Sequence, residues 1–490
     1  NNKKSILMKL NNVQKNLCIF FSIILSIIFT SFFWDKIIIP FNNSTGAYGL
    51  LSEKNYNPSN DTLRYTFFIS LPLILFFYLN LILKKKTINI LELFYEKDKE
   101  LIKNPSIINI LFFVFIIFII IEFFSLEFFV IPFDHFHDGT FLAPAQNFVA
   151  TKKLWTASYL THGGSDLLYP ILMWKTLGIK SIGAARVASI FLTLILKIIC
   201  VLFSYQITKI LSLNKGGKII FFTIFTSIII SMSHYNLQNF GYYLIPRHLY
   251  IMLFLVFFIE LFVKTNFRNI CLVLTVLIST ISIFLHIDSG FYLNLILFSF
   301  LIYLFFSKKY NDALLILFSL IAFWLITIQI IGYDEFKAFL NNTKTMISSM
   351  DLMHGFEYPK PFFSIFSDEP NGARATRGLI LQLSAGLFIL NYLISNSNNL
   401  FKIKNIFLVF LFLLSFVMYK NGLGRSDAGH IRISSSFPVI INIIFVLNYL
   451  IIFLYNKKVF LRFFSTKSAF LISIAFLTFF YVSTYSKYKI

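Results

Sequence analysis

The sequence predicts an all-α, polytopic membrane protein, and three observations lead to that prediction. The chain has 490 residues, of which 57% are hydrophobic and only 13% are charged. So many apolar residues, including 64 phenylalanines, cannot all be buried in one water-soluble core. They gather in runs of about 20, the length that an α-helix needs to cross a bilayer, and the short alternating segments of a membrane β-barrel are absent.

Thirteen apolar runs are long enough to predict membrane-spanning helices. The first, near 17–39, follows a basic stretch and lacks a small-residue cleavage site, so we expect a retained helix. The others lie near 63–83, 106–131, 182–206, 218–233, 247–263, 270–287, 289–306, 312–331, 378–395, 405–419, 434–455 and 468–485. No internal repeat or low-complexity linker separates them, and we expect a single transmembrane domain over residues 1–490.

The formal net charge of +21 is concentrated in short connections on one side of the predicted bundle. These connections carry Lys84 to Lys86, Lys215 and Lys218, Lys264 and Arg268, Lys308 and Lys309, Lys402 and Lys404, and Lys457, Lys458 and Arg462. Short basic loops stay in the cytoplasm, so we expect a multi-pass protein of the cytoplasmic (inner) membrane. The charges form no extended stripe, and no nucleic-acid partner is expected.

Three connections on the opposite side are expected to face the periplasm or the exterior. They are a first large loop at 132–181, a second at 332–377, and a shorter Gly-rich loop at 420–436. Residues from Pro144 to Trp155 predict a helix along the membrane surface, and apolar spacing predicts another from Phe336 to Met353.

The first loop opens on the densest cluster of ionisable residues, Asp134-His135-Phe136-His137-Asp138. A carboxylate placed where a membrane helix meets water suits proton transfer, and Asp138 is the candidate base, with Asp134 and His137 beside it. The alternative is that Asp138 caps the surface helix.

A metal site in the same cluster is a second hypothesis. His135 and His137 are two positions apart, so an extended loop would present both imidazoles to a divalent ion such as Mg²⁺, Mn²⁺ or Zn²⁺. Asp134 or Asp138 would supply a third ligand. The alternative is a pair of interfacial histidines that bind backbone or lipid headgroups.

A longer pattern in the first loop carries a resemblance. It comprises His137-Asp138-Gly139-Thr140-Phe141, Lys153-Leu154-Trp155, His162-Gly163, Leu168 to Trp174, and Leu177-Gly178 through Ala184-Ala185-Arg186. It resembles the first outer loop of GT-C membrane glycosyltransferases of the protein O-mannosyltransferase and aminoarabinose-transferase type. This chain has His137-Asp138 where that family usually has two adjacent acids.

The resemblance implies an enzyme that transfers a sugar from a polyprenyl-phosphate donor to a glycan, lipid or protein acceptor, with inversion at the anomeric carbon. Its active site would face the outer side of the membrane. Independently of the resemblance, such a reaction needs a base for the acceptor hydroxyl and cationic donors for the departing phosphate.

The Gly-rich loop supplies one candidate phosphate site, at Arg425, Asp427 and His430. Glycines on either side permit close approach, and the planar guanidinium of Arg425 fits phosphate oxygens. The alternative is a helix-connecting turn in which Arg425 pairs with Asp427.

Further candidates are scattered along the chain. Arg247 and His248 are secondary phosphate candidates, and His162 and Asp166 are candidates for an acceptor or sugar site; interfacial or turn roles explain them equally well. The segment at 286–290 is more simply a tight outer turn. Glu122 lies inside or near the outer end of a predicted span, so the cost of its charge in lipid predicts that it faces protein or the active-site cavity.

Two other functions remain open at this stage. A polysaccharide polymerase or ligase would use the same kind of lipid-linked donor but would add whole oligosaccharides. A transporter or flippase of lipid-linked sugars belongs to a different class, which tends to place polar groups and broken helices near the middle of the membrane.

Overall fold

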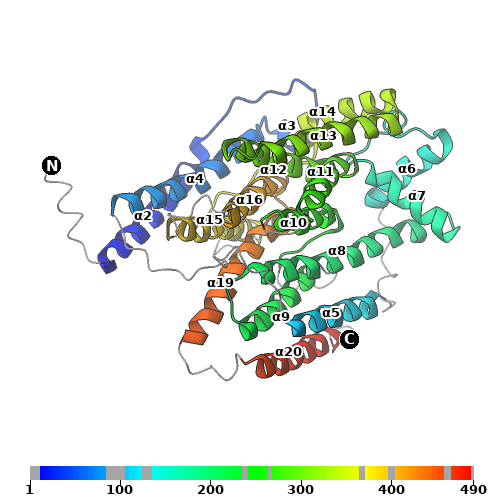
Figure 1. The fold of residues 1–490 in the computed structure, drawn as a ribbon. Coiled ribbons are helices and arrows are strands. Elements are labelled where there is room, and N and C mark those ends of the chain that lie inside the picture. Colours follow the sequence, from blue (N-terminus) through cyan, green and yellow to red (C-terminus); the bar gives the residue numbers. More distant parts are fainter. Residues whose placement is uncertain are drawn as a thin grey trace. The chain divides into compact units, whose positions relative to one another are not determined.

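A computed structural model shows an all-helical chain (Figure 1). It describes residues 12–83, 105–123, 135–233, 241–262, 267–362, 370–395, 403–456 and 465–486. Within them no strand is present, and extended pairing is confined to isolated bridge positions such as the pair Phe356 and Arg425. The predicted all-α class is therefore confirmed.

Eleven helices in the described part of the chain are long and apolar enough to cross a membrane. They coincide with eleven of the thirteen predicted spans. The span predicted near 247–263 is a helix of only 12 residues, α10 (Leu249–Glu260), too short to cross a bilayer by itself. The span predicted near 468–485 falls in α20 (Thr466–Ser486), whose described apolar part ends at Thr478.

The chain divides into two compact units. One comprises Asn1–Leu93 with Ile347–Val446, and the other comprises Phe94–Met346 with Leu447–Ile490. A single transmembrane domain therefore stays a prediction, and the units are described separately below as the first unit and the second unit.

In the first unit, α4 is the central helix. Its helices and short turns are α2 (Asn12–Phe32), η1 (Trp34–Lys36), α3 (Leu50–Glu53), α4 (Ser59–Ile82), α15 (Pro370–Ser395), α16 (Ile403–Met418), α17 (Lys420–Gly424) and α18 (Ala428–Ser434), with the first half of α19 (Ser436–Asn456). α4 packs against α2, α15 and α17. Buried aromatic residues, among them Trp34, Tyr65, Phe68, Tyr358 and Tyr419, form its core.

In the second unit, α8 is the central helix. The unit contains α5 (Ser106–Phe123), α6 (His135–Thr151), α7 (Ser165–Leu177), α8 (Ile182–Ile210), α9 (Lys215–Met232), η3 (Pro246–His248), α10, α11 (Arg268–Leu285), α12 (Ile287–Phe306), α13 (Tyr310–Ile331), most of α14 (Tyr333–His354) and α20. α8 packs against α5, α7, α9 and α10.

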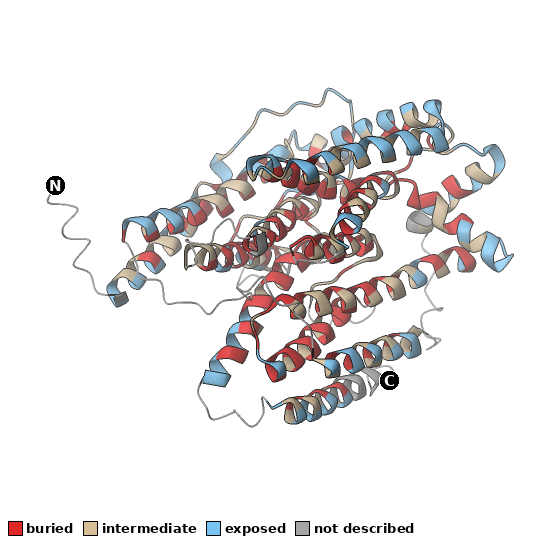
Figure 2. Ribbon diagram, in the orientation of Figure 1, coloured by how far each residue is buried: buried red, intermediate tan, exposed pale blue. Residues whose placement is uncertain are grey.

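Burial distinguishes inner from outer helices of the second unit. In α9, 78% of the apolar window is buried inside the protein, against 6% in α13 (Figure 2). Both helices are apolar, but α13 packs only one side against α11 and α12, and most of its apolar surface is not covered by described residues. We infer that α13 faces lipid, whereas α9 is an interior helix.

The helices predicted in the two large loops are both present, with different starting points. The first, α6, already begins at His135 and contains Pro144 within it, and the second, α14, begins at Tyr333. Glu335 of α14 connects the second large loop to the first by hydrogen bonds. Its Oε2 accepts from the backbone N–H groups of Leu154, Trp155 and Thr156 at 2.7–3.2 Å. Two turns later, Asn342 bonds both the N–H and the C=O of Leu160.

Candidate functional site

The second unit brings three connections together into one polar cluster. They are the loop 161–164 with the first turn of α7, the η3 turn before α10, and the junction at His286 between α11 and α12. Two backbone hydrogen bonds join the first connection to the third: Gly164 N–H to Phe284 C=O at 2.7 Å, and Ile287 N–H to His162 C=O at 2.9 Å.

Gly163 makes this close approach possible. Its φ is +124°, and an added Cβ would lie 2.7 Å from the Leu285 carbonyl oxygen. Any other residue would therefore strain the backbone and push the loop away from the α11–α12 junction. The sequence element His162-Gly163 thus fixes the position of the candidate site.

Asp166 is the most unusual group of this cluster, because it is only 1% exposed. Its Oδ2 accepts hydrogen bonds from the His162 N–H at 2.9 Å and from the Thr161 hydroxyl at 3.2 Å. Its Oδ1 is buried and accepts no hydrogen bond from the described residues. Burial raises the pKa of this carboxyl to about 6, although the two hydrogen bonds oppose the shift.

His286 lies between hydroxyl groups. Its Nδ1 is 3.1 Å from Ser165 Oγ, within hydrogen-bonding distance. The rings of Tyr169 and Tyr250 lie against it, with centroids at 6.3 and 5.7 Å, and their two hydroxyls bond each other. Burial lowers the pKa of His286 well below its usual value, with help from the charge of Arg247, so the imidazole is neutral near pH 7.

Arg247 and Asp288 form the exposed edge of the cluster. Arg247 Nη1 lies 3.5 Å from Asp288 Oδ2, and the two side chains are 24% and 46% exposed. His248 is buried, which lowers its pKa to about 3. The predicted residues His162, Asp166, Arg247 and His248 therefore lie in one region, and the 286–290 turn belongs to it as well.

Asp138 lies elsewhere in the second unit, within the first turn of α6. Arg186, near the start of α8, donates to both of its oxygens: Nε to Oδ1 at 3.0 Å and Nη2 to Oδ2 at 2.5 Å. Asp138 follows the helix start at His135 and so lies inside the helix, not at the position of a cap. The two-point ion pair with Arg186 ties the first turn of α6 to α8.

The side chains of Asp134, His135 and His137, the other ionisable members of the Asp134–Asp138 cluster, are not among those described. Asp134 lies outside the described residues, and for His135 and His137 only the backbone, in α6, is described. Among the side chains that the structure does describe, no group of three or more His, Cys, Asp or Glu residues is arranged to hold a metal ion. The metal hypothesis at His135 and His137 stays a prediction.

In the first unit, the Gly-rich loop is organised around Asp427. This carboxylate caps α18 by accepting from the His430 N–H at 2.9 Å, and it also accepts from Arg425 Nε at 2.8 Å. Burial opposes its ionisation, but hydrogen bonds from His430 and the charge of Arg425 hold the pKa of Asp427 well below its usual value. This pairing is the arrangement that the turn interpretation requires.

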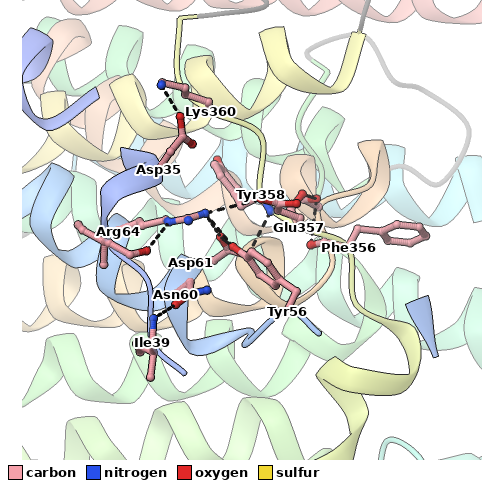
Figure 3. A network of polar contacts seen from close by, with 12 residues as sticks. Asp35, Ile39, Tyr56, Asn60, Asp61, Arg64, Phe356, Glu357, Tyr358 and Lys360 are labelled. Carbon is pink, nitrogen blue, oxygen red and sulfur yellow. Dashed lines mark hydrogen bonds and ion pairs between the residues drawn. The ribbon is translucent and has the colours of Figure 1, made fainter. Parts of the chain in front are cut away.

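A second polar network in the first unit was not predicted from the sequence (Figure 3). Arg64, 4% exposed, donates to the Tyr56 hydroxyl at 2.8 Å and to the Ile37 carbonyl at 3.2 Å. Asp61, 1% exposed, accepts from the Tyr56 hydroxyl at 2.6 Å and from the Tyr358 N–H at 3.1 Å. An available signal was the Asp61/Arg64 pair, spaced i,i+3 at the start of an apolar run.

Glu122 faces protein, as predicted. Its Oε2 lies 2.7 Å from Nζ of Lys197, in the middle of α8, and the two side chains are 18% and 4% exposed. A buried pair of opposite charges avoids the cost of leaving either charge alone in lipid.

No protein-family model, curated protein or solved structure matches the chain.

Proposed function

We propose that this membrane protein is a glycosyltransferase of the GT-C type, which moves a sugar from a polyprenyl-phosphate donor to a hydroxyl acceptor. The pair Asp138–Arg186 is the observation on which the proposal depends. It places a carboxylate and a guanidinium side by side in the loop segment that resembles the GT-C pattern. A base and a cation are the two groups that the reaction requires.

In this proposal, Asp138 removes the proton of the acceptor hydroxyl as its oxygen attacks the anomeric carbon. The bond from that carbon to the phosphate oxygen breaks on the opposite side, which inverts the configuration. The phosphate leaves with its negative charge, and cationic side chains stabilise it. In the polar cluster, which lies elsewhere in the second unit, the partly exposed Arg247 is a second candidate cation, with Asp166 and His162 beside it for hydroxyl groups of the sugar or acceptor.

The direct test is an assay of the purified protein with polyprenyl-phosphate sugars, with and without a chelator. We expect transfer to an added acceptor, with the free polyprenyl phosphate as the second product. Absence of sugar transfer across a panel of donors would refute the proposal. Loss of activity with the chelator, restored by a divalent ion, would support a metal at His135 and His137.

The proposal also requires that the first loop face the outer side of the membrane. Lys153 and Lys308 are both exposed and lie in connections that the charge pattern assigns to opposite sides. A membrane-impermeant thiol reagent should label Lys153→Cys and not Lys308→Cys in intact cells. The reverse result would place the first loop in the cytoplasm.

Two alternatives give different products. A polymerase or ligase would transfer an oligosaccharide as one unit, which the same assay detects by product mass. A flippase of lipid-linked sugars is favoured by the Lys197–Glu122 pair, since buried charges inside membrane spans commonly mark transport pathways. It would move labelled donor across a vesicle membrane without consuming it.

A further inference from the structure

The geometry of Asp138 raises a difficulty for its role as a base. Arg186 donates to both carboxylate oxygens, and the side chains of Asp138 and Arg186 are 13% and 23% exposed. A guanidinium bound in this two-point fashion stabilises the ionised carboxylate and lowers its affinity for a proton. In this arrangement the ion pair with Arg186 hinders Asp138 from accepting a proton, and we call Asp138 a masked base. An efficient reaction requires that Arg186 release it.

Phosphate is the chemical group best suited to draw it away. Its oxygens offer the guanidinium the same planar two-point contact that a carboxylate offers. The pair is partly exposed, so a ligand can approach it without unfolding α6 or α8. An exchange of partners keeps Arg186 beside an anion, whereas Asp138 loses the contact with this cation at a partly buried position, which raises its affinity for a proton.

We propose that Arg186 alternates between Asp138 and the phosphate of the lipid-linked donor, so that donor binding unmasks the base. This inference rests on the proposed function, because it assigns Arg186 to the same reaction. It explains why the base would be held inactive without donor: an exposed active carboxylate would otherwise meet water or acceptor with no sugar in place. Arg186 is then both a phosphate contact and a positioning residue for Asp138.

The chain contains a matched control in the same unit. Arg268, the first residue of α11, donates to Asp312 in the first turn of α13 at 2.7 Å, and their side chains are 26% and 16% exposed. The two ion pairs match in residue types and exposure and lie near helix starts, although the described contact of Arg268 with Asp312 is one hydrogen bond, whereas Arg186 makes two to Asp138. Only the pair Asp138–Arg186 belongs to the loop assigned to the reaction.

The experiment measures binding of a fluorescent isoprenyl monophosphate to the purified, detergent-solubilised protein, so it does not depend on catalysis. Asp138→Asn removes the competing anion, and we expect the probe to bind about three- to tenfold more tightly, the effect of removing an ion pair worth roughly 1 kcal/mol. Arg186→Gln should weaken binding at least about tenfold, and Arg186→Lys should fall between. Asp312→Asn and Arg268→Gln should leave the affinity unchanged.

Unchanged or weaker binding by folded Asp138→Asn would overturn the exchange, with thermal melts used to verify that each variant is folded. Competition with inorganic phosphate identifies the source of the phosphate. A probe displaced only by lipid-linked phosphate supports the donor as ligand, whereas equal displacement by free phosphate overturns that assignment. If Asp138→Asn binds the probe more tightly but the wild-type protein transfers no sugar, only the proposed function is refuted. If the wild type transfers sugar but Asp138→Asn does not bind the probe more tightly, only the exchange is refuted.

Discussion

The polar connections of the two units differ in how completely their charges are satisfied. In the first unit, both oxygens of the buried Asp61 accept hydrogen bonds, Arg64 reaches three segments of the chain, and Asp427 is both a helix cap and an ion-pair partner. In the second unit, Asp166 keeps a buried oxygen that accepts no hydrogen bond from the described residues. A network in which every polar group is hydrogen-bonded stabilises the fold. A buried acceptor without a hydrogen bond destabilises the folded state, and such groups are often found where a protein binds a ligand or carries out chemistry.

The comparison also indicates that a high local density of polar residues in the sequence does not by itself mark the functional site. The Gly-rich loop has the higher local density of charged and polar residues. Asp427 bonds Arg425 and His430 within a few positions. Ser426 and Lys420 instead reach Glu357 and Asp351, 69 positions away. The cluster at Asp166 is assembled from residues more than a hundred positions apart, as in the contact between Ser165 and His286. We therefore propose that the function lies in the second unit and that the polar connections of the first unit have a structural role.

The largest expected effect is at Asp138. Asp138→Asn keeps the shape of the side chain but cannot accept the proton, so transfer should fall by about 100- to 10,000-fold. The measurement is the rate of sugar transfer at saturating donor. Asp312→Asn is the control, and a folded Asp138→Asn variant that transfers sugar at the normal rate would remove Asp138 from the mechanism.

Next in size is the effect of Arg64 on stability. Arg64→Met removes the cation from a buried network and leaves Asp61 and Glu357 without it, which should destabilise the protein by about 3 kcal/mol or more. Thermal unfolding in detergent measures this loss. Arg377→Met, at an exposed position of the same unit, should change the melting temperature little; equal effects of both changes would contradict a structural role for the network.

Asp166 should make stability fall with rising pH. Its pKa is about 6 in the folded protein and 3.8 in an ordinary environment, so the folded state holds the proton more strongly. The stabilising contribution is complete below about pH 4 and disappears as the pH rises through about 6, a total of about 3 kcal/mol. Melting temperatures of wild type and Asp166→Asn between pH 4 and 8 should converge at the acid end.

Asp427 should show the opposite sign, which sharpens the contrast between the units. Because its folded pKa lies below the ordinary value, its contribution is present at neutral pH and is lost as the pH falls. Asp427→Asn should therefore reduce the acid sensitivity of the melting temperature. The same sign for Asp166 and Asp427 would show that the two environments are alike after all.

The smallest effects are expected at Arg425. It is 42% exposed and paired with Asp427, so Arg425→Ala should cost only about 0–1 kcal/mol. Asp427→Ala should cost about 0.5–2 kcal/mol because it also removes the cap of α18. Donor affinity should stay unchanged in both variants; a ten- to hundredfold loss in Arg425→Ala would instead support the phosphate-clamp interpretation.

The sequence predicted the helices well because their signal is local. Apolar runs of sufficient length identified α9 and α13 alike, although one is buried and the other exposed, since hydropathy does not distinguish lipid from protein surroundings. The same limit explains why α10 was predicted as a span: the run is apolar over enough residues, and only the structure shows that the helix stops after 12 of them.

The site was predictable in its members but not in its assembly. His162 and Asp166 were candidates for an acceptor or sugar site and Arg247 was a candidate for phosphate, but their grouping depends on contacts that no sequence spacing encodes. His286 was interpreted as part of a turn and belongs to the cluster as well. Arg186 was noticed only as part of a pattern, because its partner lies 48 positions away.

The carboxylate of Glu335 also bears on how the chain is made. Its three acceptor contacts are to residues about 180 positions earlier, so the ribosome completes the loop at 154–156 long before it reaches the group that fastens it. At common elongation rates the interval is roughly 10 to 35 s. During that time the nascent loop lacks the hydrogen bonds from Glu335. A chaperone or membrane-insertion factor that assists this protein would have this interval in which to act.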